Sequence, residues 1–227
     1  MRYKGVLLAA GNSQRFDGIK QLAIVNEGGA RAMLAHTYSA MAASDVANCA
    51  IALRDTQKSA FANVLPQDTD VICCPDAQLG MGHTIANVVA TLADDISHLL
   101  ISLADQVALT HEHFNRLVSA SNKAPNNIIC ASTEAGVSVP AIFPRHFFPS
   151  LSTLQGDKGA KKVILETLAN QARHVSLIAM PEAQIDIDSR EDLRRWQQQS
   201  FNRVNKHDNK VTTINFDRQP NMEKQHD

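Results

Sequence analysis

Short apolar segments alternate with amphipathic segments along most of the chain. Residues 4–9 form a continuous, largely apolar run that ends in a glycine turn, which is typical of a strand buried on both faces. Residues 31–43 instead carry apolar side chains three and four positions apart, the spacing of an amphipathic helix. This alternation predicts an α/β fold with right-handed crossovers and a doubly wound, mostly parallel sheet. The same two patterns predict further strands over residues 46–53, 70–74, 98–103 and 127–132, and further helices over residues 57–65, 82–93 and 110–121.

The second half of the chain is less regular. Residues 139–143 are expected to form an edge or hairpin strand, because Pro140 has no N–H group to donate to a ladder. A helix is predicted over residues 157–168 with Asp157 as its N-cap, and a strand over residues 174–179.

The end of the chain separates into a last helix and a polar segment. Ser189 to Asp192 match the [ST]-x-x-[DE] pattern that opens a helix. Beyond this helix the chain is rich in Asn, Asp and Lys and has little periodicity. We therefore expect a single domain over residues 1–202, followed by a polar, flexible tail over residues 203–227.

The composition is that of an ordinary globular protein, with 44% hydrophobic and 20% charged residues. The 22 Lys and Arg residues balance the 23 Asp and Glu residues, which argues against a nucleic-acid-binding protein with a basic surface. The longest apolar run near the N-terminus, residues 6–10, is too short for a signal peptide or for a membrane span of ~20 residues. We therefore expect a cytoplasmic protein with no membrane partner.

The four cysteines, Cys49, Cys73, Cys74 and Cys130, include no CxxC pair. Cys73 and Cys74 are adjacent, a poor arrangement for one tetrahedral metal ion. Three of the four lie in β-branched apolar stretches, so we expect reduced thiols buried in strands, with a redox or zinc site as the alternative.

A glycine-bearing loop follows the first predicted strand. Residues 9–20 (AAGNSQRFDGIK) combine small residues, which let backbone amides approach an anion, with Ser13, Arg15 and Lys20 as donors and cations. The loop matches neither GxxxxGK[ST] nor GxGxxG. Its chemistry favours phosphate binding, and an ordinary polar turn with exposed cations is the alternative.

Carboxylates occur where two further segments end. Asp105 follows the strand predicted over residues 98–103, and a carboxylate buried there needs a cation, for which Mg²⁺ beside a phosphate loop is the natural candidate. The alternative is a helix cap before Thr110. Asp186 and Asp188 alternate onto one face of an extended segment, and either is a candidate second metal ligand or part of a solvated strand end.

Two other motifs carry residues that could take part in chemistry. Residues 80–84 (GMGHT) precede a predicted helix, whose N-terminal amides favour an anion, although an ordinary glycine-rich loop has the same composition. His111 and His113 are not expected to form a metal pair, because residues two apart do not share a helix face. No nucleophile and base of the Ser, His and Asp type can be singled out.

Five segments together resemble the MobA-like nucleotidyltransferases. Residues 7–20 are similar to the signature loop of that family, and LAAG rather than LAGG resembles its molybdenum cofactor cytidylyltransferase branch. The resemblance covers about residues 3–200 and implies a Rossmann-like fold of the nucleotide-diphospho-sugar transferase type. The other four segments follow in the family's order, at residues 75–76 with 80–85, 103–106, 139–144 with 156–160, and 186–193.

The resemblance implies transfer of a nucleoside monophosphate, CMP from CTP, to the phosphate of molybdopterin or the molybdenum cofactor, with release of pyrophosphate. It also implies a Mg²⁺-dependent enzyme, with a molybdoenzyme or its maturation chaperone as a further partner. Two alternatives stay open: a nucleotidyltransferase of the same fold with another phosphorylated acceptor, and a non-catalytic carrier or chaperone of the molybdenum cofactor.

The resemblance also implies roles for individual residues. Arg15, Lys20 and Asp105 would be catalytic, and Asp105 and Asp188 would hold Mg²⁺. The nucleotide-binding residues would be Leu8, Ala9, Ala10, Gly11, Ser13, Arg15, Lys20, Asp76, Gly80, Met81, Gly82 and Thr84, and the acceptor-binding residues Pro140, Asp157 and Lys158.

The chain departs from the family's pattern at three places. Val107 follows Gln106 where the family commonly has proline, which concerns the shape of the loop. Ser138 and Val139 replace a frequent Gly-His pair, which puts the acceptor end of the site in question. Asp188 is kept, although the residues after it differ from the family's Thr-Pro.

Overall fold

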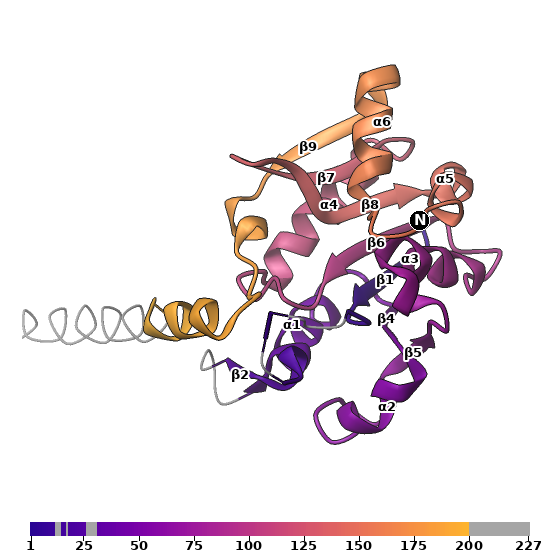
Figure 1. The fold of residues 1–227 in the computed structure, drawn as a ribbon. Helices are drawn as coiled ribbons and strands as arrows, with labels where there is room; N and C mark the ends of the chain where they lie inside the picture. The colour runs from indigo at the N-terminus through magenta and orange to yellow at the C-terminus, as the bar shows by residue number, and fades with distance from the viewer. Residues whose placement is uncertain (12–14, 17, 26–30, 200–227) are drawn as a thin grey trace, which may run out of the picture.

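Seven strands form one central sheet in the computed structural model, which describes residues 1–11, 15–16, 18–25 and 31–199 (Figure 1). Their order across the sheet is β5-β4-β1-β6-β8-β7-β9. The strands are Tyr3–Leu8 (β1), Cys49–Leu53 (β4), Asp70–Cys73 (β5), His98–Leu103 (β6), Ile128–Thr133 (β7), Gly136–Pro144 (β8) and Val175–Ala179 (β9). Ile24–Val25 (β2) and Arg31–Ala32 (β3) form a separate antiparallel pair.

Most neighbouring strands of the large sheet run parallel. β1 pairs parallel with β4 and β6, β4 with β5, and β7 with β9. β8 alone among these seven strands runs antiparallel to its neighbours, β6 and β7. The predicted α/β fold with a doubly wound, mostly parallel sheet is therefore confirmed.

Helices cover both faces of the sheet (Figure 1). Val6 and Leu8 of β1 share a buried cluster with side chains of α3, α5 and α6, whereas Leu7 shares the opposite cluster with α1, α2 and α4. The alternation of side chains along one strand thus explains why the strand is apolar throughout. These helices are Met33–Ala42 (α1), Asp55–Phe61 (α2), Met81–Ala90 (α3), His111–Lys123 (α4), Phe148–Ser152 (α5) and Lys161–Gln171 (α6).

Residues 190–199 form a last helix, which opens as the sequence predicts. Ser189 Oγ accepts a hydrogen bond from the Asp192 amide at 3.2 Å, and Asp192 Oδ2 accepts one from the Ser189 amide at 2.8 Å. Gln197 donates to the carbonyl of Ile24 at 2.8 Å, so the helix lies beside β2 (Figure 1). The tail expected over residues 203–227 lies outside the described residues. No helix in the described part of the chain has the length and apolarity needed to span a membrane.

The hairpin alternative for residues 139–143 is confirmed, but the edge alternative is wrong. β8 lies between β6 and β7 in the interior of the sheet. Pro140 is accommodated there because the pairing of β8 with β6 ends at Ala141. The register between β7 and β8 also shifts at this point, from Ala141 to Ser138, so neither partner strand pairs with Pro140.

The predicted N-cap role of Asp157 is wrong. α6 begins at Lys161, and Ala160 occupies its N-cap position without a side-chain hydrogen bond. Gly156, with φ +60°, turns the chain immediately before Asp157, which leaves this carboxylate in the connection between α5 and α6. Because Asp157 lies in this connection rather than at the start of α6, it can line the cavity described below.

The cysteine prediction holds in part. Cys74 and Cys130 are buried, and burial raises the pKa of each thiol to about 12. Cys49 is partly buried, whereas Cys73 is exposed on the edge strand β5. All four thiols are unbridged.

Candidate functional site

A cavity of about 550 Å³ opens at the carboxyl ends of β1 and β6. Open α/β sheets bind their ligands at this edge, in the crevice beyond the strand ends. Leu8 from the end of β1 and Asp105 just after β6 line the cavity. The loop after β1 and the segment that leads into α3 contribute most of its other lining residues.

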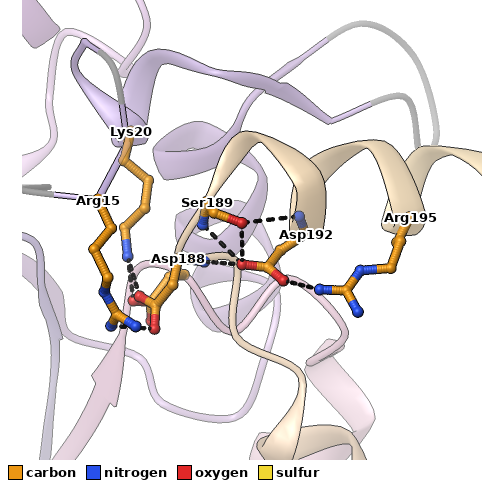
Figure 2. Close-up of polar contacts among 7 residues, drawn as sticks. Arg15, Lys20, Asp188, Ser189, Asp192 and Arg195 are labelled. Atoms are coloured by element: carbon orange, nitrogen blue, oxygen red, sulfur yellow. Dashed lines mark hydrogen bonds and ion pairs between the residues drawn. The ribbon is translucent and has the colours of Figure 1, made fainter.

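Lys20 lies between two carboxylates in this cavity. Its Nζ donates to Asp105 Oδ2 at 2.7 Å and to Asp188 Oδ1 at 3.0 Å. Arg15 donates to the other carboxylate oxygen of Asp188 at 2.7 Å, so both cations point at Asp188 (Figure 2). The side chains of Lys20 and Asp105 are only 12% and 19% exposed, so water screens their attraction less than that of a surface pair. Arg15 is 76% exposed.

Hydrogen bonds from the chain around Asp105 bring Asp188 to this position. The Ile187 amide donates to the carbonyl of Asp105 at 3.2 Å. The buried side chain of Gln106 donates to the carbonyl of Ala183 at 2.8 Å. The segment before the last helix is therefore held against the end of β6, and the two carboxylates converge although 83 positions separate them in the sequence.

The loop that carries the two cations is supported from both sides. The buried side chain of Gln21 donates to the carbonyl of Ala9 at 3.0 Å. Phe16 is buried in a cluster with Ile187 and with Trp196 of the last helix. The last helix therefore packs against the glycine-bearing loop through Phe16.

Charge interactions shift the pKa values of two groups near the cavity. Burial lowers the pKa of Lys20, but the Asp105 and Asp188 carboxylates outweigh it and raise the pKa above the ordinary 10.5. The stability that Lys20 contributes through its raised pKa is therefore fully present at neutral pH, and it is lost as the pH rises from the ordinary value of 10.5 through that raised pKa. Partial burial and the charges of Asp105 and Asp188, offset in part by Lys20, raise the pKa of Asp186 to about 6.

The segment that leads into α3 packs directly against the connection between α5 and α6. Gly80 is the N-cap of α3 and has φ +118°, a conformation that side chains disfavour. A Cβ atom on Gly80 would lie 2.3 Å from the carbonyl carbon and oxygen of Gly156. Glycine is therefore required at position 80 both by the backbone angle and by the space available.

Gly80→Ala is expected to destabilise the protein more than Gly136→Ala does. Gly136 also has a positive φ, +99°, but no atom of the described residues lies within 4 Å of the position of its Cβ, so its substitution tests the backbone angle alone. The contact with Gly156 should add about 1–3 kcal/mol to the cost at Gly80. Urea unfolding of both variants measures the difference, and equal losses would contradict the close packing of these two segments.

Most of the site residues predicted from the sequence line the cavity together. Ser13 lies outside the described residues. Asp76, Gly82, Pro140 and Lys158 are not among the lining residues: Asp76 is hydrogen-bonded to Asn87, Pro140 is buried in β8 and Lys158 is exposed. The predicted residues that do line it are Leu8, Ala9, Ala10, Gly11, Arg15, Lys20, Gly80, Met81, Thr84, Asp105, Asp157 and Asp188.

Sequence reasoning missed six lining residues. Leu79 is 55% exposed, but exposure is known only from the structure, so no signal in the sequence pointed to this residue. The others have no chemical motif and line the cavity because they adjoin predicted site residues in the chain. The six residues are Gln21, Ala77, Gln78, Leu79, Leu103 and Ala104.

The donor set fits a small divalent cation that a substrate helps to bind. Asp105 Oδ1 is buried and has no hydrogen-bond partner among the described residues. Within the described part of the chain, no three His, Cys, Asp or Glu side chains are grouped so as to hold a metal ion. A cation held by Asp105 and Asp188 would thus take its remaining ligands from phosphate oxygens and water, as Mg²⁺ commonly does.

The family model of the MobA-like NTP transferase domain matches residues 5–174, well over half of the chain. The purine catabolism protein PucB of Bacillus subtilis (strain 168) is 32% identical over 92 residues. That alignment covers 40% of this chain and 43% of PucB, so the chain spans less than half the length of this relative.

Solved structures share the fold over nearly the whole described domain. The manganese complex of Rv0371c from Mycobacterium tuberculosis H37Rv superimposes with a TM-score of 0.68 at 22% identity, over 87% of this chain and 98% of that one. CMP:2-keto-3-deoxy-manno-octonic acid synthetase complexed with CTP gives a TM-score of 0.66 at 13% identity, over 89% and 100%. The architecture is therefore that of the nucleotide-diphospho-sugar transferases, as predicted.

Proposed function

The chain belongs to the MobA-like NTP transferase family, and from this premise we propose that it transfers CMP from CTP to the terminal phosphate of molybdopterin and releases pyrophosphate. The observation that carries the proposal is the position of Lys20 between Asp105 and Asp188 in the cavity at the ends of β1 and β6. One cation and two carboxylates at this place suit a ligand that combines phosphate groups with a divalent metal ion.

The proposed transfer needs no nucleophilic side chain. An oxygen of the acceptor phosphate, which is already anionic, attacks the α-phosphorus of CTP and forms the new bond. The bond from the α-phosphorus to the oxygen that bridges it to the β-phosphate breaks, and pyrophosphate leaves with that oxygen. Lys20 and Arg15 would donate to the phosphate oxygens and balance the charge that develops on the leaving group. Catalysis would thus consist of alignment and charge neutralisation.

A bound triphosphate would change the partners of the two cations. Lys20 and Arg15 are both hydrogen-bonded to Asp188 in the structure. Phosphate oxygens offer these side chains new anionic partners, which would leave Asp188 and Asp105 as ligands for a cation. Each charged group would therefore keep a partner of opposite charge when the substrate binds.

Asp105 and Asp188 would hold Mg²⁺ in the proposed enzyme. The chemistry that this cation would supply is neutralisation: it would offset negative charge on the α-phosphate. The buried Asp105 Oδ1, which has no hydrogen-bond partner among the described residues, supports this assignment, and the manganese complex of Rv0371c is in line with a divalent cation in this fold.

CTP is expected to be preferred over GTP. Ala10 is only 5% exposed and lines the cavity. If the base stacks at this position, the methyl group that glycine lacks would leave less space for a purine than for a pyrimidine. The structure of CMP:2-keto-3-deoxy-manno-octonic acid synthetase with CTP is in line with a cytidine nucleotide in this fold. The measurement is pyrophosphate release with each of the four nucleoside triphosphates, with and without a molybdopterin acceptor. Ala10→Gly is the matched variant and should lower the ratio of kcat/KM for CTP to kcat/KM for GTP. Equal kcat/KM for CTP and GTP in the wild type would contradict the assignment.

A different phosphorylated acceptor is the second candidate. Ser138 and Val139 replace the pair that the family resemblance leads one to expect, and Pro140 lies inside β8 rather than on the cavity wall. Release of pyrophosphate from CTP that depends on another phosphorylated metabolite, and not on molybdopterin, would favour this candidate.

A further inference from the structure

Two hydrogen bonds hold the turn between α5 and α6 against the start of α3. The Gly82 amide donates to the carbonyl of Gly156 at 2.8 Å, and the Gly156 amide donates to Nδ1 of His83 at 3.1 Å. The two backbones touch directly, because a Cβ atom on Gly82 would lie 2.6 Å from the Gln155 nitrogen. The position of the turn therefore depends on backbone contact and on one imidazole ring.

His83 contacts the turn before Asp157 but does not line the cavity. Because the Gly156 amide is a donor, Nδ1 of His83 must be unprotonated, and the proton of the neutral ring lies on Nε2. The side chain is partly buried and is absent from the residues that line the cavity. Any influence of His83 on a ligand must consequently pass through the turn that it holds.

Asp157 is the residue that this turn places at the cavity. It follows Gly156 directly and lines the cavity together with Gly80 and Met81. Its carboxylate is exposed and has no hydrogen bond or ion pair with any residue that the structure describes. An ionised carboxylate only accepts hydrogen bonds and repels other anions, so this position suits the N–H donors of an uncharged ring better than a phosphate group.

We propose that His83 is a positioning residue that holds Asp157 where its carboxylate accepts hydrogen bonds from the N–H groups of a substrate's heterocyclic ring. The inference rests on the proposed function, which supplies two such rings, the cytosine of CTP and the ring system of the molybdopterin acceptor. The shared chemistry is an amino or ring N–H donor. The two rings can be told apart by kinetics, because a contact with cytosine affects the KM for CTP and a contact with the acceptor ring affects the KM for the acceptor.

Steady-state kinetics of two His83 variants test the positioning role. His83→Ala removes the acceptor of the Gly156 hydrogen bond, whereas His83→Asn carries an oxygen on Cγ, where Nδ1 stands. We expect His83→Ala to raise one KM about 3- to 10-fold at nearly constant kcat, and His83→Asn to restore it. A raised KM for CTP identifies cytosine as the ring, and a raised KM for the acceptor identifies the acceptor. Unchanged KM values, or no rescue by asparagine, would overturn the proposal.

A double-mutant cycle with Asp157→Ala tests whether His83 acts through this carboxylate. Asp157→Ala should raise the same KM value as His83→Ala. If one residue acts through the other, adding His83→Ala to the Asp157→Ala variant produces no further rise. If the KM of the double variant instead rose by the product of the two single-variant increases, the proposal would be overturned.

Hydrogen exchange of the ligand-free protein separates this inference from the proposed function. The Gly156 amide, which donates to His83, should exchange at least about 3-fold faster in His83→Ala and at the wild-type rate in His83→Asn. That pattern in a protein that does not use CTP would refute the proposed function alone. Unchanged exchange in a folded His83→Ala variant would refute the positioning role of His83 whatever the substrate.

Discussion

Replacing Asp105 with Asn is expected to reduce turnover about 100- to 1,000-fold while the protein remains folded. The loss corresponds to the several kcal/mol that a bound cation contributes to charge stabilisation at a transferring phosphoryl group. The amide oxygen of Asn can still accept the hydrogen bond from Lys20, and Lys20 keeps Asp188 at 3.0 Å, so the melting temperature without ligand should change little. Pyrophosphate release and the rise in melting temperature with CTP and Mg²⁺ are the two measurements, and both should be strongly reduced.

Asp186→Asn is the matched control for Asp105→Asn. Asp186 is a neighbouring carboxylate with a raised pKa, but it does not line the cavity. Its variant should turn over like the wild type. Normal turnover in Asp105→Asn would mean that Asp105 is structural. A wild-type protein whose melting temperature rises with molybdopterin alone, and which turns over no nucleotide, would instead support the carrier alternative.

Lys20→Ala is expected to lower kcat/KM about 10- to 150-fold. A charge-assisted hydrogen bond to a phosphate contributes about 1.5–3 kcal/mol, and this side chain makes two such bonds to carboxylates in the absence of substrate. Its removal also leaves Asp105 and Asp188 without their shared cation, so the free energy of unfolding should fall as well. Kinetics with CTP and urea unfolding of the same variant measure the two losses.

Arg15→Ala distinguishes the contribution of Arg15 to stability from that of Lys20. Arg15 is 76% exposed and, among the residues that the structure describes, is hydrogen-bonded to Asp188, so this ion pair should contribute at most about 1 kcal/mol to stability. We therefore expect Arg15→Ala to retain the stability that Lys20→Ala loses. Activity of Lys20→Ala within twofold of the wild type would exclude Lys20 from the proposed mechanism.

Helix and strand positions were predicted well where the local pattern was strong. The strand over residues 98–103 has the predicted bounds, and its side chains are nearly all buried because helices cover both faces of the sheet. Errors occurred where tertiary contacts override a local rule. The proline of β8 argued for an edge strand, but an irregularity in the β7–β8 pairing accommodates it in the interior. Asp157 had the right residue type for an N-cap, yet the chain turns at Gly156 and α6 starts later.

The chemical types of the site residues could be read in the same way, because each stands at the end of a predicted strand or in a glycine-bearing loop. The residues that these side chains contact could not be read from the sequence. Lys20 contacts Asp105 and Asp188, which lie 85 and 168 positions further along the chain, through a segment that Gln106 and the carbonyl of Asp105 hold in place. No local pattern specifies such a contact, because it depends on how distant segments pack.

The sequence alone determined the architecture and the kind of chemistry of this protein. Apolar periodicity reports which faces a strand or helix buries, and short motifs report which charges stand at strand ends, since both are properties of neighbouring residues. The tertiary structure alone decided that Lys20 is shared by two carboxylates, that Pro140 is buried away from the cavity, and that His83 holds the turn of Asp157. These are contacts between segments far apart in the chain, and their geometry is set by the packing of the whole domain rather than by any one segment.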